Sequence, residues 1–126
     1  MIVKGKTTRT IGRETETLAC EYLQAQGLHL LARNFQVPRG EIDLIMEDRQ
    51  SLIFVEVRYR RNNHFGSGAE TISYHKQRKL LTAAACYLQR NPQQAERPSR
   101  FDVVSIVMEN SRYSINWIRN AFQAPA

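Results

Sequence analysis

Two short apolar segments each carry one carboxylate at a position where a buried strand should carry none. They read GEIDLI at residues 40–45 and FVEVR at residues 54–58. Because successive side chains of a strand point to opposite faces of a sheet, alternation places Asp43 with Glu41 and Ile45, on the face opposite to Ile42, Leu44 and Met46. The two patterns predict strands over residues 41–47 and 52–60 that are apolar enough to be buried and yet carry charge.

The residues between these strands determine which side chains face each other. If residues 48–51 form the turn of a hairpin, Glu47 faces Leu52, and Asp43 then faces Glu56 directly. Like charges opposite each other across a ladder are destabilising, so this pairing requires a compensating cation. Two converging carboxylates suit a hard divalent ion such as Mg²⁺ or Mn²⁺. The alternative is that both acids lie on an exposed strand edge and face water.

The positive charge of the chain favours a polyanionic partner. The sequence holds 18 Lys and Arg against 12 Asp and Glu, which gives a net charge of +6. A basic chain is weak support for nucleic-acid binding unless the cations cluster. Here they follow the second acidic strand and open a later helix, and we expect them to hold a phosphate backbone without reading sequence. These cations are Arg60, Arg61, Lys76, Arg78 and Lys79.

The remaining periodicity predicts one α/β domain over residues 1–126. Helices are expected over 8–26 and from a Ser73 cap to about Arg90, with further strands over 28–37, 100–108 and 113–118. A helix between strands of one sheet implies a crossover and a parallel pair. The expected architecture is therefore a mixed sheet flanked by helices, in the order α-β-β-β-α-β-β. Residues 1–7 are expected to form a flexible basic arm, and a C-terminal tail is expected from about residue 119.

The first helix offers a third carboxylate. At about 100° per residue, Glu14 lies at the edge of the apolar stripe, on the flank of Glu21, and Glu16 lies on the opposite side in solvent. Glu14 is therefore the acid expected to reach the sheet. The alternative is a surface acid near the start of a helix, where it complements the helix dipole.

These residues resemble a known nuclease fold. Residues 12–16 (GRETE), GEIDLI, FVEV, Phe65-Gly66, Lys76-Gln77 and residues 100–104 (RFDVV) are similar to the small bacterial YraN family, and more broadly to the PD-(D/E)xK fold. The resemblance covers residues 12 to about 107. It implies a restriction-endonuclease-like core, related to archaeal Holliday-junction resolvases.

The resemblance also implies roles for single residues. Asp43 and Glu56 match the metal ligands, joined by the Val57 carbonyl, and Glu14 matches the acid of the first helix. Gln77 matches a glutamine near the scissile phosphate. Arg58 stands where the fold usually has lysine, and arginine does not release its proton as lysine can. It can still hold a phosphate through paired hydrogen bonds.

The expected function is a Mg²⁺- or Mn²⁺-dependent endonuclease that acts on nucleic-acid phosphodiesters. DNA is the expected partner, with branched or recombination intermediates among the candidate substrates. A junction-resolving activity would need a homodimer, because it requires two sites related by a two-fold axis. One alternative is a binding module of the same fold without turnover, and a weaker one is a protein-interaction adaptor. The apolar runs are too short to span a membrane, and the expected location is the cytoplasm.

Overall fold

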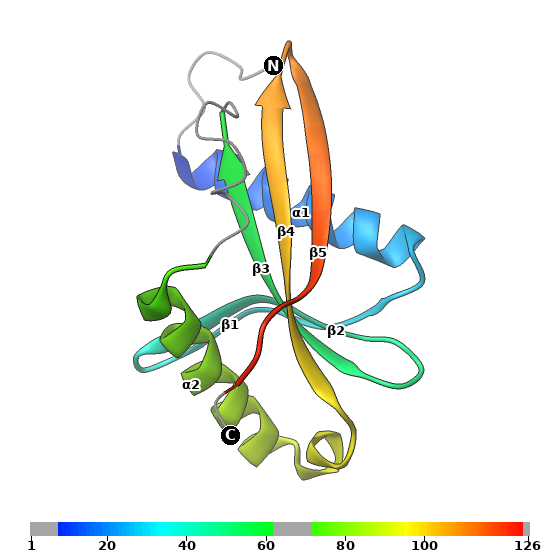
Figure 1. Ribbon diagram of the computed structural model, residues 1–126, viewed down its shortest axis with the longest axis vertical. Helices are drawn as coiled ribbons and strands as arrows, with labels where there is room; N and C mark the ends of the chain where they lie inside the picture. The colour runs from blue at the N-terminus through cyan, green and yellow to red at the C-terminus, as the bar shows by residue number, and fades with distance from the viewer. Residues whose placement is uncertain (1–7, 62–71, 125–126) are drawn as a thin grey trace.

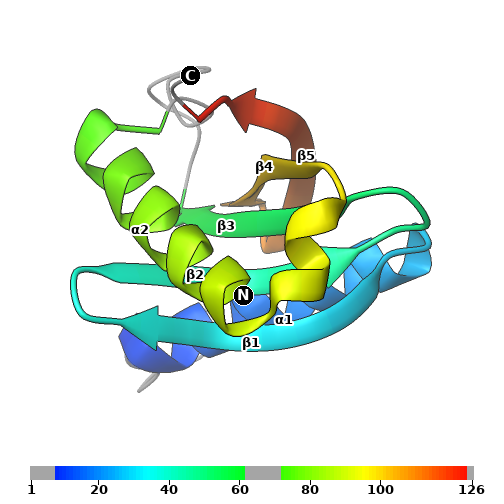
Figure 2. The ribbon, with the colours of Figure 1, turned by 90° about the horizontal axis from the view of Figure 1, so that it is seen from below.

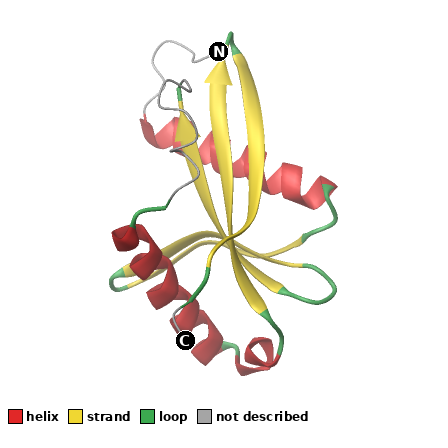
Figure 3. Ribbon diagram, viewed as in Figure 1, coloured by secondary structure: helices red, strands yellow, loops and turns green. Residues whose placement is uncertain are grey.

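The structure, a computed structural model, describes residues 8–61 and 72–124. Helices and strands follow the predicted order α-β-β-β-α-β-β (Figure 3), with one short 3₁₀ helix before the fourth strand. The elements are α1 (Thr8–Ala25), β1 (His29–Val37), β2 (Gly40–Glu47), β3 (Leu52–Arg60), α2 (Tyr74–Arg90), η2 (Pro92–Glu96), β4 (Ser99–Glu109) and β5 (Arg112–Phe122). The predicted basic arm and the Phe65-Gly66 pair lie outside the described residues.

The five strands form one mixed sheet in the order β1-β2-β3-β4-β5. Only β3 and β4 run parallel, because α2 carries the chain across the sheet between them, and the other neighbours are antiparallel. The sheet is strongly twisted, so that β1 and β2 cross the view of Figure 1 while β4 and β5 rise along it. The mixed sheet flanked by helices is therefore confirmed.

The two long helices cover opposite faces of the sheet (Figure 2), and each face has its own apolar core. On the α1 face, Ala19 and Leu23 pack against Leu44, Ile53 and other strand residues. On the α2 face, Leu80, Ala83 and Tyr87 of the helix pack against Phe54, Ile45 and other strand residues. The central strands are thus buried on both sides, which is why they are almost continuously apolar.

The strand ends show one difference from the sequence prediction. β5 continues to Phe122 rather than ending at residue 118, so the expected tail begins later. Ile118 and Phe122 pack against the α2-side core, and Phe122 stacks on Phe101 with ring centroids 4.6 Å apart. These tertiary contacts extend the strand beyond its local pattern.

The RFDVV stretch has a structural role in β4. Asp102 is 1% exposed and accepts hydrogen bonds from Arg100 Nε at 3.0 Å, Trp117 Nε1 at 2.9 Å and the Asn120 backbone N–H at 2.9 Å. A buried carboxylate with this many donors is fully satisfied. It fastens the end of β5 to β4, where the register of the two strands shifts.

Candidate active site

The β2–β3 hairpin has the predicted register and brings the two acidic positions together. Glu47 pairs with Leu52, and the ladder continues to Leu44 opposite Val55. Next to that pair, the Asp43 side chain bonds to the backbone of β3: its Oδ2 accepts a hydrogen bond from the Val57 N–H at 2.8 Å. The Asp43 carboxylate is therefore fixed against β3 by a main-chain group.

The regular alternation of β2 ends at Asp43. Leu44 and Met46 pack in the α1-side core as expected, but Ile42 packs in the α2-side core with Ile45. The prediction that Ile42 shares a face with Leu44 and Met46 is wrong. The physical reason is a local irregularity of the strand at Asp43. The Asp43 side chain accepts the Val57 N–H of β3, which in a regular ladder would donate to a main-chain carbonyl of β2.

Glu56 is a buried carboxyl group beside Asp43. The residue is 5% exposed, and its Oε1 accepts no hydrogen bond from any described residue. Burial is the largest cause that raises the pKa of Glu56, to about 8; the charge and the hydrogen bond of Asp43 raise this pKa as well, whereas Lys76 lowers it. A protonated Glu56 can donate to Asp43, so the two carboxyl groups hold one proton between them near neutral pH.

Lys76 joins this pair from the first turn of α2. Its Nζ lies 3.3 Å from Glu56 Oε2 and 3.4 Å from Glu41 Oε1. Burial lowers the pKa of Lys76, but Glu56, Glu41 and Asp43 together raise it above its ordinary value. The sequence prediction grouped Lys76 with the phosphate-binding cations, and the structure places its ammonium among carboxylates.

Gly40 explains how α2 comes close enough for this contact. A Cβ at Gly40 would lie 2.8 Å from both Ala83 N and Lys79 O, which are backbone atoms of α2. Only glycine permits such an approach of helix to strand. The first residue of the GEIDLI motif therefore sets the position of the helix that carries Lys76.

The first helix presents a different acid from the predicted one. Glu16 was expected in solvent, and that prediction is wrong, because Glu16 Oε1 is buried without a hydrogen-bond partner among the described residues. Burial raises the pKa of Glu16, the charge of Asp43 raises it further, and Arg33 and Asn34 oppose the rise. Glu16 is therefore the acid of α1 whose pKa is raised by the charge of Asp43.

Glu14 lies on the other flank of α1. It borders a shallow hollow together with Leu18, Glu21 and Tyr113 of β5. The buried positions of the helix are Thr15, Ala19, Cys20 and Leu23, and Leu18 packs beside them as a partly buried residue. With these positions on the sheet, Glu16 also approaches it, and the role of Glu14 stays a prediction.

The other predicted site residues lie on or next to β3 and in the first turns of α2, the two elements that carry Glu56 and Lys76. Arg58 is half-buried and follows Glu56 on the same face of β3. The Gln77 side chain donates to the Ile72 carbonyl at 2.9 Å, which fastens the start of α2 to the preceding segment. Arg60 lies about 13 Å beyond Glu56 along the strand. The half-buried or exposed cations nearby are Arg60, Arg61, Arg78 and Lys79.

Tyr74 is a feature that the sequence prediction missed. It is 72% exposed at the start of α2, and the Arg78 guanidinium lies 5.8 Å from the centre of its ring. An exposed aromatic ring beside a cation is suited to stacking on an unpaired base. Its position one helical turn before Arg78 was visible in the sequence, but its exposure was not.

The residues fit a divalent ion of the kind that keeps part of its water shell. In residues 8–61 and 72–124, no three His, Cys, Asp or Glu side chains are grouped closely enough to hold a metal by themselves. Mg²⁺ is commonly held by one or two carboxylates with waters and substrate phosphates. The buried Glu56 Oε1 has no donor among the described residues and has Asp43 beside it, which matches that ligand set.

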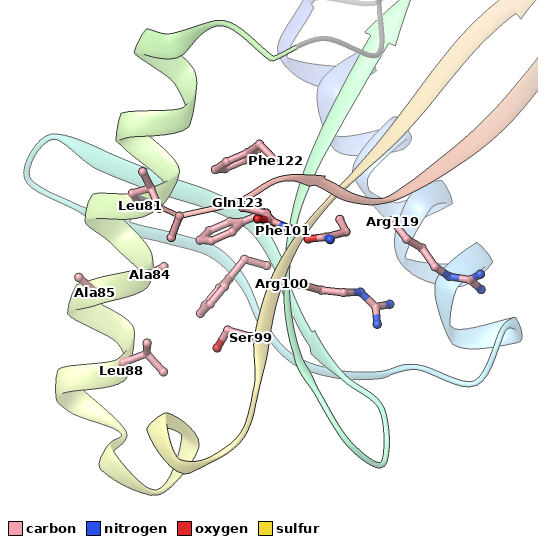
Figure 4. Close-up of a pocket in the computed structure, with 13 residues that line it drawn as sticks. Leu81, Ala84, Ala85, Leu88, Ser99, Arg100, Phe101, Arg119, Phe122 and Gln123 are labelled. Atoms are coloured by element: carbon pink, nitrogen blue, oxygen red, sulfur yellow. The ribbon is translucent and has the colours of Figure 1, made fainter. Parts of the chain in front are cut away.

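A separate cavity of about 780 Å³ lies between α2 and the ends of β4 and β5. Leu81 and Leu88 face Phe101 and Phe122 across it, whereas Arg100 and Arg119 lie on the other side of the strands (Figure 4). Its lining is mainly apolar and includes none of the predicted site residues. This cavity therefore holds none of the acidic groups of the candidate site.

The fold and the site define a small mixed α/β protein whose central hairpin carries the buried Glu56 and the half-buried Asp43 beside a lysine. No helix in the described part of the chain is long and apolar enough to cross a membrane. The sequence matches the profile of the family described as "Uncharacterised protein family UPF0102" over residues 15–106. The chain belongs to this UPF0102, or YraN, family.

Relatives match along most of their length. A UPF0102 protein of Nitrosococcus oceani is 50% identical over 121 residues, which cover 96% of this chain and 98% of the relative. A UPF0102 protein of Pseudomonas savastanoi pv. phaseolicola is 45% identical over 114 residues, covering 90% and 93%. The calcium complex of SfsA from Pyrococcus furiosus aligns with a TM-score of 0.38 and 16% identity, over 89% of this chain and 63% of that longer chain. This last likeness is too low to carry an argument.

Proposed function

We propose that this protein is a metal-dependent nuclease whose centre is the Asp43–Glu56 pair. The observation that carries the proposal is the burial of Glu56, at 5% exposure, against a second carboxyl group. Burying a carboxyl group beside a second acid is costly unless a cation or a function compensates the cost. Lys76 contacts Glu56 Oε2 and leaves Glu56 Oε1 without a donor among the described residues. A divalent ion would give this oxygen a positively charged partner.

Each residue of the centre has a defined part in the proposed reaction. Asp43 and Glu56 would hold Mg²⁺ or Mn²⁺ beside the Val57 peptide, and the ion would supply activation of water and neutralisation of phosphate charge. Asp43 is oriented by its hydrogen bond from Val57, so it presents its other oxygen to the site without rearrangement. Glu16 is half-buried, and its pKa is raised by burial and by the charge of Asp43, so it is the acid of α1 that would position the water.

Nucleic acid would be held by the cations around the centre. Arg58 would hold the reacting phosphate, and Arg60 at the end of β3 and Arg61 directly after it would continue the positive charge. Arg78 and Lys79 supply charge from α2, next to the exposed Tyr74. Because Tyr74 can stack on a base that has left a duplex, DNA with unpaired or branched segments is the substrate class that we favour.

A cleavage assay tests the proposal. Linear duplex, single-stranded, flap and four-way junction DNA would be incubated with Mg²⁺, Mn²⁺ or EDTA. We expect cleavage of at least one substrate with metal, none with EDTA, and loss of cleavage in Asp43→Ala. Glu96→Gln, which changes an exposed acid of η2, is the matched control and should cleave like the wild type.

The same assay separates the alternatives. If DNA binding weakens steeply with salt and no substrate is cleaved, the protein is a nucleic-acid-binding module of the same fold rather than a nuclease. Each phosphate contact contributes about 0.9 log units of affinity per decade of salt for duplex DNA, so Lys79→Ala should lower the slope by about one contact. A flat salt dependence would favour the protein-adaptor alternative.

A further inference from the structure

Lys76 is held so that its ammonium reaches the carboxylates that would bind metal. The Ser73 Oγ accepts the Lys76 backbone N–H at 3.1 Å and caps α2, and Gln77 ties the same turn to Ile72. The backbone of Lys76 is thereby fixed close to the sheet, where the close packing at Gly40 also holds the helix. Only the side chain remains free to change its position.

The lysine and a divalent ion would use the same carboxyl group. Lys76 Nζ lies 3.3 Å from Glu56 Oε2, and Glu56 Oε1 is the oxygen without a donor among the described residues. An ammonium and a metal ion on one carboxylate would be only a few Å apart and would repel each other strongly. The Lys76 side chain is 34% exposed, so its ammonium can leave the carboxylates without unfolding the helix.

We propose that Lys76 is the internal cation of this site: it pairs with Glu56 and Glu41 in the free protein and transfers to a phosphate when metal and nucleic acid bind. This inference rests on the proposed function, because it takes the Asp43–Glu56 pair as the metal site. Its consequence is that metal and nucleic acid bind cooperatively. Phosphate removes the lysine from the carboxylates, which favours the metal, and by linkage the metal favours phosphate binding equally.

The first test measures Mn²⁺ affinity of the free protein by calorimetry or electron paramagnetic resonance. Lys76→Met keeps the length of the side chain and removes its charge, and we expect it to bind Mn²⁺ about tenfold more tightly or better. The loss of the ammonium also favours a proton on Glu56, but a divalent ion feels twice the repulsion that a proton feels. The net change is therefore tighter metal binding.

Two further variants keep this test specific. Arg49→Met removes one exposed cation at the β2–β3 turn, which the intervening residues of both strands separate from Asp43 and Glu56. This variant should leave Mn²⁺ affinity unchanged. Lys76→Arg keeps a cation on the same turn and should retain an affinity near that of the wild type. Unchanged or weaker Mn²⁺ binding in a folded Lys76→Met protein would overturn the inference, as would equal tightening in Arg49→Met.

The second test measures the coupling itself. Mn²⁺ affinity is determined with and without a duplex DNA whose backbone carries phosphorothioates to slow cleavage. Wild type should bind Mn²⁺ more tightly with the DNA, and the gain should shrink by about fivefold or more in Lys76→Met. An equal gain in both proteins would contradict the inference. Failure of wild type to bind Mn²⁺ under either condition would instead reject the proposed function, on which the inference rests.

Discussion

Replacing Glu56 by glutamine should remove the pH dependence of stability that this residue imposes. The pKa of Glu56 is about 8 in the folded protein, against an ordinary value of 4.5. Between these two pH values the folded state keeps a proton that the unfolded chain releases. Stability of the metal-free protein must then fall as pH rises from about 4.5 to about 8, and level off above.

The size of this effect follows from the two pKa values. At about 1.4 kcal/mol per pH unit, the full interval between 4.5 and about 8 corresponds to about 5 kcal/mol. Between pH 5 and pH 9 about 4 kcal/mol of this range is accessible. The glutamine side chain of the variant stays neutral throughout, so Glu56→Gln should match the wild type near pH 5 and exceed its stability by about 4 kcal/mol at pH 9.

The measurement is urea unfolding followed by circular dichroism, at each pH unit from 5 to 9 in EDTA. The difference between variant and wild type cancels the contribution of Glu16, whose pKa is also raised, because Glu16 is present in both proteins. Glu96→Gln, at an exposed position, should show no pH-dependent difference. A Glu56→Gln difference that stays constant within about 1 kcal/mol from pH 5 to 9 would refute the burial argument.

Metal provides an independent check of the same reasoning. Mn²⁺ should restore stability to the wild type at pH 8 to 9, because a ligand that binds only the folded state stabilises it in proportion to the logarithm of its concentration. Glu56→Gln lacks a carboxylate and should gain much less. Equal stabilisation of both proteins would place the metal elsewhere.

Three further substitutions test the construction of the site. Gly40→Ala should lower stability by about 1–3 kcal/mol, measured by urea unfolding, because its Cβ would meet backbone atoms of α2 at 2.8 Å. Asp102→Ala should cost about 3–5 kcal/mol in the same assay, since Arg100 and two other donors lose their shared buried acceptor. Arg58→Ala should slow cleavage by about 10²-fold or more, whereas Arg58→Lys should retain part of the activity, because it keeps a cation at the phosphate. Cleavage by Arg58→Ala at the wild-type rate would remove Arg58 from the mechanism.

Local sequence was enough to predict the elements and the register of the hairpin. The alternation of residues 52–60 gave the two faces of β3, and the four-residue turn gave the Glu47–Leu52 pairing. The Ser73 cap of α2 was also predicted and is confirmed by its hydrogen bond from the Lys76 N–H. These features depend on contacts between residues close in sequence, where periodicity and turn chemistry apply directly.

The surroundings of the acids required the tertiary structure. The helical pattern of α1 gave a stripe but not the rotation of the helix on the sheet, so the choice between Glu14 and Glu16 depended on packing against β1 and β2. Likewise, Lys76 could be assigned to α2 from the sequence, but its contact with Glu56 depends on how closely α2 approaches Gly40.

The sequence by itself thus determined that two carboxylates enter the middle of an apolar hairpin, because strand period and turn length decide this locally. The tertiary structure alone decided that Glu56 is buried, that Lys76 rather than a strand residue pairs with it, and that Glu16 approaches from the opposite face. Burial and charge pairing depend on elements that are distant in the chain. They arise only when α1 and α2 pack on the two sides of the sheet.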